Sequence, residues 1–276
     1  MKKKASPEKE MSFLDHLEEL RWHLVRSTFA IVIVGVVAFI FKSFIFDVLI
    51  FGPSRPDFAT YRLFCDVSRS MGMEAFCFNE MPFRIQSRTM SGQFSAHMWT
   101  SIYAGIIIAF PYILYEFWRF ISPGLKENER SSSRGFIIIA SLLFFLGVLF
   151  GYYVITPLSI NFLGSYQVSE KVINSFDLDS YISLVRTSVL ASGIIFELPI
   201  IIYILTKIGL VTPEALRKYR KFSLIVVLAV SAIITPPDVA SQIIVAIPIL
   251  ILYEVSIYIS KMVIKKQKRK ERANVR

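Results

Sequence analysis

The stretch GFIIIASLLFFLGVLFGYYVITPL, residues Gly135 to Leu158, decides the fold of this chain. It contains no charged side chain, and apolar runs of roughly 20 residues are typical of helices that cross a lipid bilayer. Gly147 and Gly151 form a GxxxG pair, which permits the close approach of another helix and favours ordinary packing over a specific dimer. The stretch therefore predicts a membrane-spanning helix.

Apolar segments on both sides of this stretch predict an all-α integral membrane protein with six transmembrane helices. The predicted spans are residues 24–49, 96–121, 135–158, 182–205, 222–234 and 239–259. The fifth span is short, so we expect the bilayer to thin locally or neighbouring helices to shield its ends. We expect residues 1–10 to be a disordered leader, residues 11–260 to be the membrane domain, and residues 261–276 to be a disordered basic cytoplasmic tail.

The composition supports this class of protein. Of the 276 residues, 54% are hydrophobic and 24 are Phe, which is more apolar than a soluble domain of this length. The net charge of +10 is compatible with nucleic acid or an anionic surface, but the basic residues flank the apolar runs and form no patch with interleaved aromatics. We therefore expect a membrane surface as the partner, and no nucleic acid.

Six spans place both ends of the chain on one side of the membrane. Lysine and arginine concentrate before the first span, in residues 119–134, in residues 207–221 and after residue 260. The other connections contain only Arg55, Arg62, Arg69, Arg84, Arg88 and Lys171. Because basic connections stay in the cytoplasm, we expect both termini to be cytoplasmic. The N-terminus lacks the pattern of a cleavable signal or an organelle transit peptide, which favours a bacterial protein.

The first external loop, residues 52–95, is polar and is the only region expected to fold outside the membrane. It contains Cys65 and Cys77, the two cysteines of the chain. In an oxidising periplasm they could form a disulfide. Two free thiols remain the alternative, because sequence alone provides no geometry.

Residues 12–26, SFLDHLEELRWHLVR, predict a short amphipathic helix at the membrane surface before the first span. Ser12 and Asp15 have the spacing of a capping box. Asp15 and Glu19 are like charges at i,i+4, which costs an isolated helix about 0.2–0.5 kcal/mol. The pattern leaves two interpretations open: a solvated acidic face, or an acidic surface that binds a cationic partner.

The sequence contains no HExxH, GxSxG, Walker A, dinucleotide-binding or CxxC motif, so we expect no enzyme activity, metal or cofactor. His16 and His23 are expected to be solvated near the predicted cytoplasmic surface. Arg186, close to the external end of the fourth span, is expected to extend towards water. Glu254, in the sixth span, is a weaker candidate for a functional role.

Glu197 lies near the middle of the fourth predicted span. A carboxylate at this depth is costly when ionised, so it usually faces protein or water and has a function. Pro199 cannot donate a hydrogen bond to the carbonyl of Ile195, which predicts a free polar group beside Glu197. A protonated, structural glutamate at a helix kink remains the alternative.

Several motifs together resemble one family, the TatC proteins. They are HLEELRWHL, PYILYEFWRFISPGLKENER, FELP and TPPDVASQ, in this order and with the predicted topology, over residues 12–260. TatC is the polytopic receptor subunit of the twin-arginine protein translocase. The resemblance implies a receptor that binds twin-arginine signal peptides of folded precursor proteins at the cytoplasmic face.

The resemblance also implies the site residues and the partners. By motif position, Glu19 and Glu129 would receive the arginine pair, Arg21 and Phe120 would belong to the same site, and Glu197 would be the intramembrane glutamate of the family. Pro53 and Asp238 match motif positions with loosely assigned roles. The implied setting is the bacterial cytoplasmic (inner) membrane, with TatA- and TatB-type single-span subunits, a homo-oligomer within the complex, and the proton-motive force as the energy source.

Two alternatives come from other classes of protein. The first is a proton-coupled secondary transporter that uses Glu197 as its proton site, although the sequence shows no evident internal repeat. The second is an intramembrane enzyme, which the missing nucleophile and metal motifs disfavour. Uptake by proteoliposomes that contain this chain alone would support the transporter.

Overall fold

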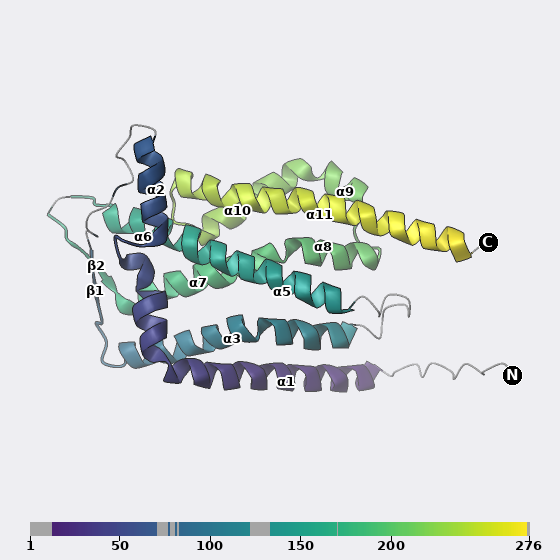
Figure 1. Cartoon of the computed structure of the whole chain (residues 1–276), viewed down its shortest axis with the longest axis horizontal. Coiled ribbons are helices and arrows are strands. Elements are labelled where there is room, and N and C mark those ends of the chain that lie inside the picture. The colour runs from purple at the N-terminus through teal and green to yellow at the C-terminus, as the bar shows by residue number, and fades with distance from the viewer. Residues whose placement is uncertain are drawn as a thin grey trace.

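The computed structural model describes residues 13–70, 77, 81, 83–121, 133–169 and 171–274. The long helices lie side by side along one axis (Figure 1). The start of α1 (Phe13–Ile40) and the end of α11 (Val239–Asn274) lie at the same end of the bundle, which we call the terminal end. We call the opposite end the far end. The predicted leader lies outside the described residues.

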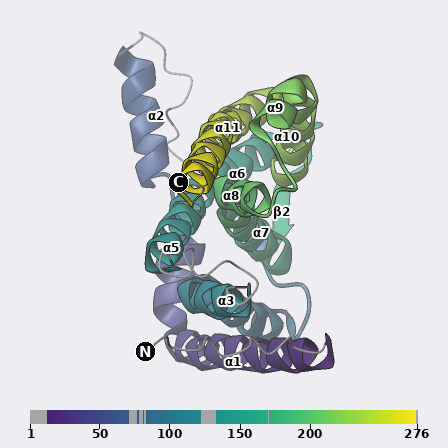
Figure 2. The same cartoon turned by 90° about the vertical axis from the view of Figure 1, so that its right-hand side faces the viewer.

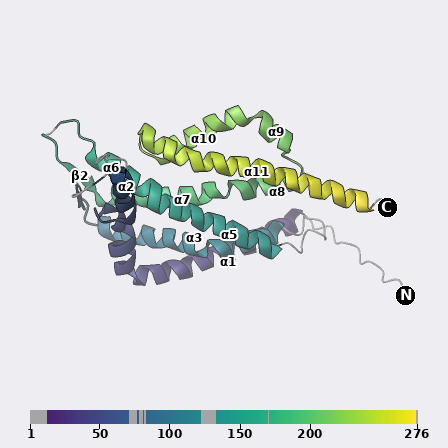
Figure 3. The same ribbon diagram turned by 45° about the horizontal axis from the view of Figure 1, so that its top comes forward.

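Within the described residues, five helical segments are long and apolar enough to span a membrane: residues 17–40, 92–121, 135–165, 178–207 and 239–269. They confirm an all-α integral membrane protein. The predicted fifth span is α10 (Arg220–Ile234), which has 15 residues and is shorter than the roughly 20 that a bilayer core requires. It lies beside α11, as Figure 3 shows.

The first span begins earlier than the sequence predicted. α1 continues without a break from Phe13, so residues 13–26 extend the span along its axis and form no separate helix on the membrane surface. Between Phe13 and Gly35 there is no Pro or Gly to interrupt it. A π-helix, η1 (Phe44–Ile50), and a short 3₁₀ turn, η2 (Gly52–Ser54), follow at the far end. The predicted cap Ser12 lies outside the described residues.

α1 packs closely against α3 (Gly92–Ile121), which runs in the opposite direction. A Cβ atom added to Gly105 would lie 2.5 Å from the carbonyl oxygen of Ile31 and 3.3 Å from the Cα of Gly35. The two backbones can approach this closely only because both positions lack a side chain. This contact fixes α1 relative to α3.

The third span consists of α5 (Ser133–Phe150), the π-helix η4 (Gly151–Ile155) and α6 (Thr156–Ser165). Its GxxxG pair packs within the chain, against α7 (Leu178–Phe196). A Cβ on Gly147 would meet the carbonyl oxygen of Ser192 at 2.6 Å, and one on Gly151 would meet that of Ser188 at 2.7 Å. The predicted close helix approach is therefore an intramolecular contact.

The fourth span breaks at Glu197 into α7 and α8 (Leu198–Lys207). α8 packs on α11, where the Thr206 hydroxyl donates a hydrogen bond to the Ser260 hydroxyl at 2.8 Å. The side chain of Gln267 donates to the carbonyl of Lys207 at 3.1 Å. The prediction of a disordered tail is wrong, because α11 continues to Asn274. Lys, Arg and Glu favour helix, and Gln267 holds this part of it to α8.

The far end carries α2 (Ala59–Ser70) and two parallel strands, β1 (Phe83–Gln86) and β2 (Asn174–Asp177). In the register, Phe83 faces Asn174. Two connections therefore fold together here, whereas the sequence predicted structure only in the first. Cys65 and Cys77 are joined by a disulfide.

The short helix α9 (Pro213–Lys218) lies between α8 and α10. Thr212 caps it, because its side chain accepts a hydrogen bond from the N–H of Ala215 at 3.2 Å. Thr212 is a favoured cap residue and Pro213 a favoured first helical residue, so the local sequence explains where α9 begins.

Gly147→Ala should lower the apparent melting temperature of the purified protein, because the added methyl group has no room against Ser192. Overpacking of this kind typically costs about 1–3 kcal/mol. Gly135→Ala is the matched control in the same helix, since a Cβ there meets nothing within 4 Å. Equal melting temperatures for the two variants would contradict the close α5–α7 contact.

Candidate functional site

A buried carboxylate, Glu116, joins α1 and α3 near the terminal end. Its side chain is only 2% exposed. Nδ1 of His23 lies 2.5 Å from Oε2, the Tyr112 hydroxyl donates to Oε1 at 2.8 Å, and Nη1 of Arg26 lies 3.8 Å from Oε2. Three polar groups therefore take the place of water around this carboxylate.

This cluster was not predicted from the sequence. His23 was expected to be solvated, yet its side chain is only 13% exposed and contacts Glu116. The available signal was an acidic residue inside the apolar part of a predicted span, which normally needs a partner. That partner stands 93 residues earlier in the chain, so the sequence could not identify it.

Phe120 and Glu19, two of the four residues predicted to bind the signal peptide, lie next to this cluster. The Phe120 ring meets the His23 ring edge-on, with centroids 6.1 Å apart. Glu19 is exposed and lies one turn before His23 on the same side of α1. The helix contact that buries Glu116 thus places Glu19 close to the end of α3 that carries Phe120.

The other two predicted residues are placed differently. The Arg21 side chain is 66% exposed, pairs with Glu18 at 3.5 Å and lies over the Trp22 ring at 5.5 Å. It is two residues from both Glu19 and His23, so it leaves α1 on another side. Glu129 lies outside the described residues.

Glu197 occupies the break between α7 and α8 and is 7% exposed. Neither carboxylate oxygen accepts a hydrogen bond from the described part of the chain. The predicted free carbonyl is not found, because the N–H of Glu197 reaches the carbonyls of Ile194 and Ile195. The unsatisfied polar group at the kink is therefore the glutamate side chain.

Asp238 and Pro53 both accept hydrogen bonds from neighbouring residues of the fold. Asp238 caps α11, where its carboxylate accepts hydrogen bonds from the N–H of Ser241 at 2.8 Å and of Ala240 at 3.3 Å. Hydrogen bonds from Ser241 lower the pKa of Asp238. Pro53 is buried, and its carbonyl accepts a hydrogen bond from the Tyr61 hydroxyl at 3.0 Å.

Arg186 and Glu254, two charged residues that were singled out from the sequence, both form ion pairs. Arg186 does not extend into water: its side chain is 10% exposed, pairs with Asp179 at 3.7 Å and lies over the Tyr103 ring at 5.1 Å. Glu254 pairs with Arg220 at 2.6 Å, and both side chains are about half exposed. An exposed pair of this kind indicates α10–α11 packing and gives no sign of an ion path.

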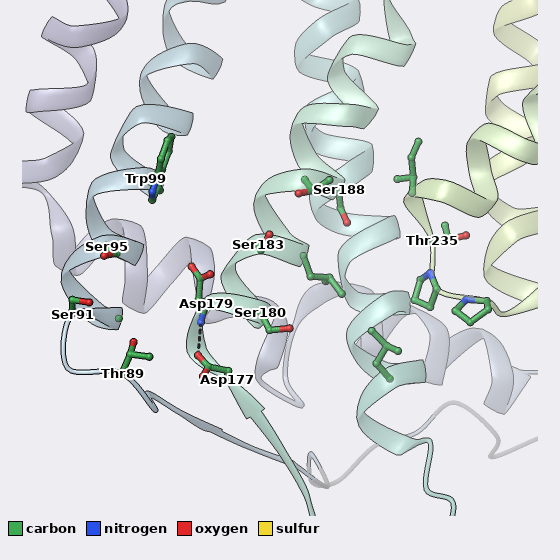
Figure 4. Close-up of a pocket in the computed structure, with 17 residues that line it drawn as sticks. Thr89, Ser91, Ser95, Trp99, Asp177, Asp179, Ser180, Ser183, Ser188 and Thr235 are labelled. Atoms are coloured by element: carbon green, nitrogen blue, oxygen red, sulfur yellow. Dashed lines mark hydrogen bonds between the residues drawn. The ribbon is translucent and has the colours of Figure 1, made fainter.

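A cavity of about 900 Å³ opens at the far end between the starts of α3 and α7 and the α10–α11 connection (Figure 4). Its lining combines apolar side chains with hydroxyl groups, including those of Ser95, Ser183, Ser188 and Thr235. The cavity contains none of the residues predicted for signal binding. Among the described residues, no group of three or more His, Cys, Asp or Glu side chains could hold a metal ion.

Comparison with known proteins gives one consistent family. The model of "Sec-independent protein translocase protein (TatC)" matches residues 15–248. A TatC protein of Blattabacterium sp. subsp. Periplaneta americana is 45% identical over 94% of this chain and 98% of its own length. The Aquifex aeolicus TatC protein is 34% identical over 95% of this chain and its full length.

Solved structures give the same result. A crystal structure described as the twin arginine translocase receptor TatC superposes with a TM-score of 0.66 at 34% identity, covering 90% of this chain and 99% of its own. A second crystal structure of the receptor, in the detergent DDM, superposes with a TM-score of 0.68.

Glu116→Ala should lower the apparent melting temperature in detergent, because His23, Arg26 and Tyr112 lose their common partner. A buried polar group left without a partner costs about 1–3 kcal/mol. Glu18→Ala is the control on the surface of α1, where loss of an exposed ion pair costs about 0–1 kcal/mol. A Glu116→Ala melting temperature as high as that of the control would show that the cluster does not hold α1 to α3.

Asp238 should make stability depend on pH. Its folded-state pKa is lowered, so its contribution is present above the unfolded carboxyl pKa of about 3.9 and is lost as the pH falls through the folded value. Asp238→Asn keeps a capping side chain but has no charge to titrate. The melting temperature of the unsubstituted protein should therefore fall more between pH 7 and acid pH than that of the variant. Parallel curves would contradict this.

Proposed function

The chain belongs to the TatC family of Sec-independent protein translocase proteins, and from this premise we propose that it is the receptor that binds twin-arginine signal peptides of folded precursors. Membership in the family favours protein transport over a proton-coupled secondary transporter. The observation that supports the proposal is the position of Glu19, exposed beside the cluster that joins α1 to α3 and close to Phe120.

Glu19 has the environment that an arginine receptor needs. Its carboxylate is exposed and forms no hydrogen bond or ion pair within the described part of the chain. A guanidinium group is planar and binds a carboxylate through two parallel hydrogen bonds, whereas lysine offers a point charge. Glu129, by its motif position, would supply a second carboxylate for the second arginine.

The side chains that join α1 to α3 lie next to Glu19. His23 and Glu116 hold the two helices together, and Phe120 contacts the His23 ring. A carboxylate on a fixed helix loses less conformational freedom on binding than one on a mobile segment. The cluster would therefore position the receptor carboxylate without touching the signal peptide itself.

The apolar part of the signal peptide would lie along the bundle near Glu197. That carboxylate is buried without a partner in the described part of the chain, so a bound peptide or a proton could satisfy it. A residue-197 probe that never crosslinks to an inserted precursor would remove this part of the proposal.

We place the chain in the bacterial cytoplasmic membrane with the terminal end in the cytoplasm, because basic residues concentrate in the segments at that end. Export would need TatA- and TatB-type single-span subunits, further copies of this chain and the proton-motive force. A bundle of short helices alone cannot enclose a conduit for a folded protein.

Glu19→Gln and Glu129→Gln should each weaken photocrosslinking to a twin-arginine signal peptide. Loss of one charge-assisted hydrogen bond, about 1.5–3 kcal/mol, corresponds to roughly 10- to 100-fold in affinity. A peptide with two lysines in place of the arginines should bind weakly to every variant and lose little further.

Glu214→Gln provides the control for these substitutions. Glu214 is an exposed carboxylate in the first turn of α9, on a different segment from α1. This variant should crosslink like the unsubstituted protein. Crosslinking at full strength in Glu19→Gln and Glu129→Gln would rule out the two-carboxylate receptor.

A further inference from the structure

Among the helices of the described residues, α2 stands apart from the bundle. In Figure 1 it lies across the axis of the long helices at the far end, and Figure 2 shows most of its length away from the other helices. Because the long helices cross the membrane, a helix perpendicular to them at their ends lies parallel to the membrane surface. Its outer part therefore extends over the position of lipid.

The first turn of α2 is fixed to the far end of the third span. The Thr60 hydroxyl donates a hydrogen bond to the carbonyl of Tyr153, and the Tyr61 hydroxyl contacts the carbonyl of Pro157 at 3.1 Å. Just before the helix, Phe58 stacks on the Tyr153 ring with centroids 5.6 Å apart. Aromatic side chains at the ends of membrane spans are typical of the boundary between acyl chains and headgroups.

The two sides of α2 differ in chemistry. Leu63 and Val67 are 60% and 44% exposed, and they follow Thr60 at i+3 and i+7. They therefore share the side of the helix that Thr60 turns towards the span. The opposite side carries the exposed charged residues Arg62 and Arg69, and Asp66 lies between the two sides.

The disulfide leaves the apolar side of α2 open. Cys65 lies two residues from Leu63 and two from Val67, which places it on the other side of the helix. Its bond to Cys77 therefore lies away from those two side chains. The disulfide does not cover the apolar side of α2.

We propose that α2 is an interfacial helix that rests on the membrane leaflet at the far end, with Leu63 and Val67 inserted at the boundary between headgroups and acyl chains. Helices with one apolar side and one charged side bind in this way. The lipid-facing surface of α5, with exposed Leu146 and Leu149, leads through Tyr153 directly to the base of α2. The apolar side of α2 thus continues a surface that already contacts lipid.

This inference depends neither on the proposed function nor on which end of the bundle is cytoplasmic. It explains why a stretch that separates two spans carries a helix pinned at its base and joined by a disulfide to the chain that follows. A helix resting on the leaflet would fix the first connection at one depth relative to the bilayer.

The test uses Leu63→Trp and Val67→Trp in the full chain, reconstituted into phosphatidylethanolamine and phosphatidylglycerol vesicles. The acyl chains are brominated close to the headgroup, so they quench a tryptophan that inserts among them. The signal of the native Trp22, Trp99 and Trp118 is subtracted with the unsubstituted protein. We expect several-fold stronger quenching of both added tryptophans than of the one in Arg69→Trp, the control on the charged side.

The Arg69→Trp fluorescence should instead be quenched by iodide in the aqueous phase. Equal bromolipid quenching at positions 63, 67 and 69 would overturn the proposal. A second outcome would also overturn it: tryptophans at positions 63 and 67 that neither quencher reaches, but that become accessible when the protein is diluted in lipid. That result would identify a second copy of the chain as the partner that covers this side of α2. Mass analysis after alkylation without reduction verifies that each variant retains the disulfide. Because two apolar positions are tested independently, a local defect at one of them does not decide the result.

Discussion

The bundle depends on backbone contacts that glycine permits. In lipid, apolar side chains gain little by leaving one apolar surface for another, so helices associate through close packing and hydrogen bonds. Gly105 admits the backbone of α1 at Ile31, and Gly147 admits that of α7 at Ser192. These two contacts hold α1 to α3, where Glu19 and Glu116 lie, and α5 to α7, which ends at Glu197.

The α1–α3 contact gives the opening acidic stretch its position. As an isolated helix, residues 12–26 would lie on the membrane surface and would carry unfavourable like charges at Asp15 and Glu19. In the structure, α1 is a single long helix pinned at His23 to Glu116, so Glu19 is held beside the end of α3. A cationic peptide bound beside Glu19 would reduce the electrostatic repulsion between Asp15 and Glu19.

Sequence periodicity predicted the features that depend on neighbouring residues and missed those that depend on distant ones. The spans and the GxxxG approach follow from local patterns. Glu116 could not be interpreted without His23, and the helical tail could not be foreseen without the bond from Gln267 to Lys207. α2 was a different case, because its apolar spacing was present but lay within a segment dominated by charge and proline.

Glu116 and Glu197 both lie inside the spans, but their surroundings differ. Glu116 is surrounded by His23, Arg26 and Tyr112, so its burial is balanced within the chain and its role is to hold two helices together. Glu197 is also buried, at a helix break, but its carboxylate has no partner in the described part of the chain. Burial without compensation is unfavourable, so it persists where something outside the fold supplies the missing partner. Under the function proposed above, Glu197 would be the intramembrane residue through which a substrate or a proton acts, and Glu116 would hold α1 and α3 in place beside Glu19.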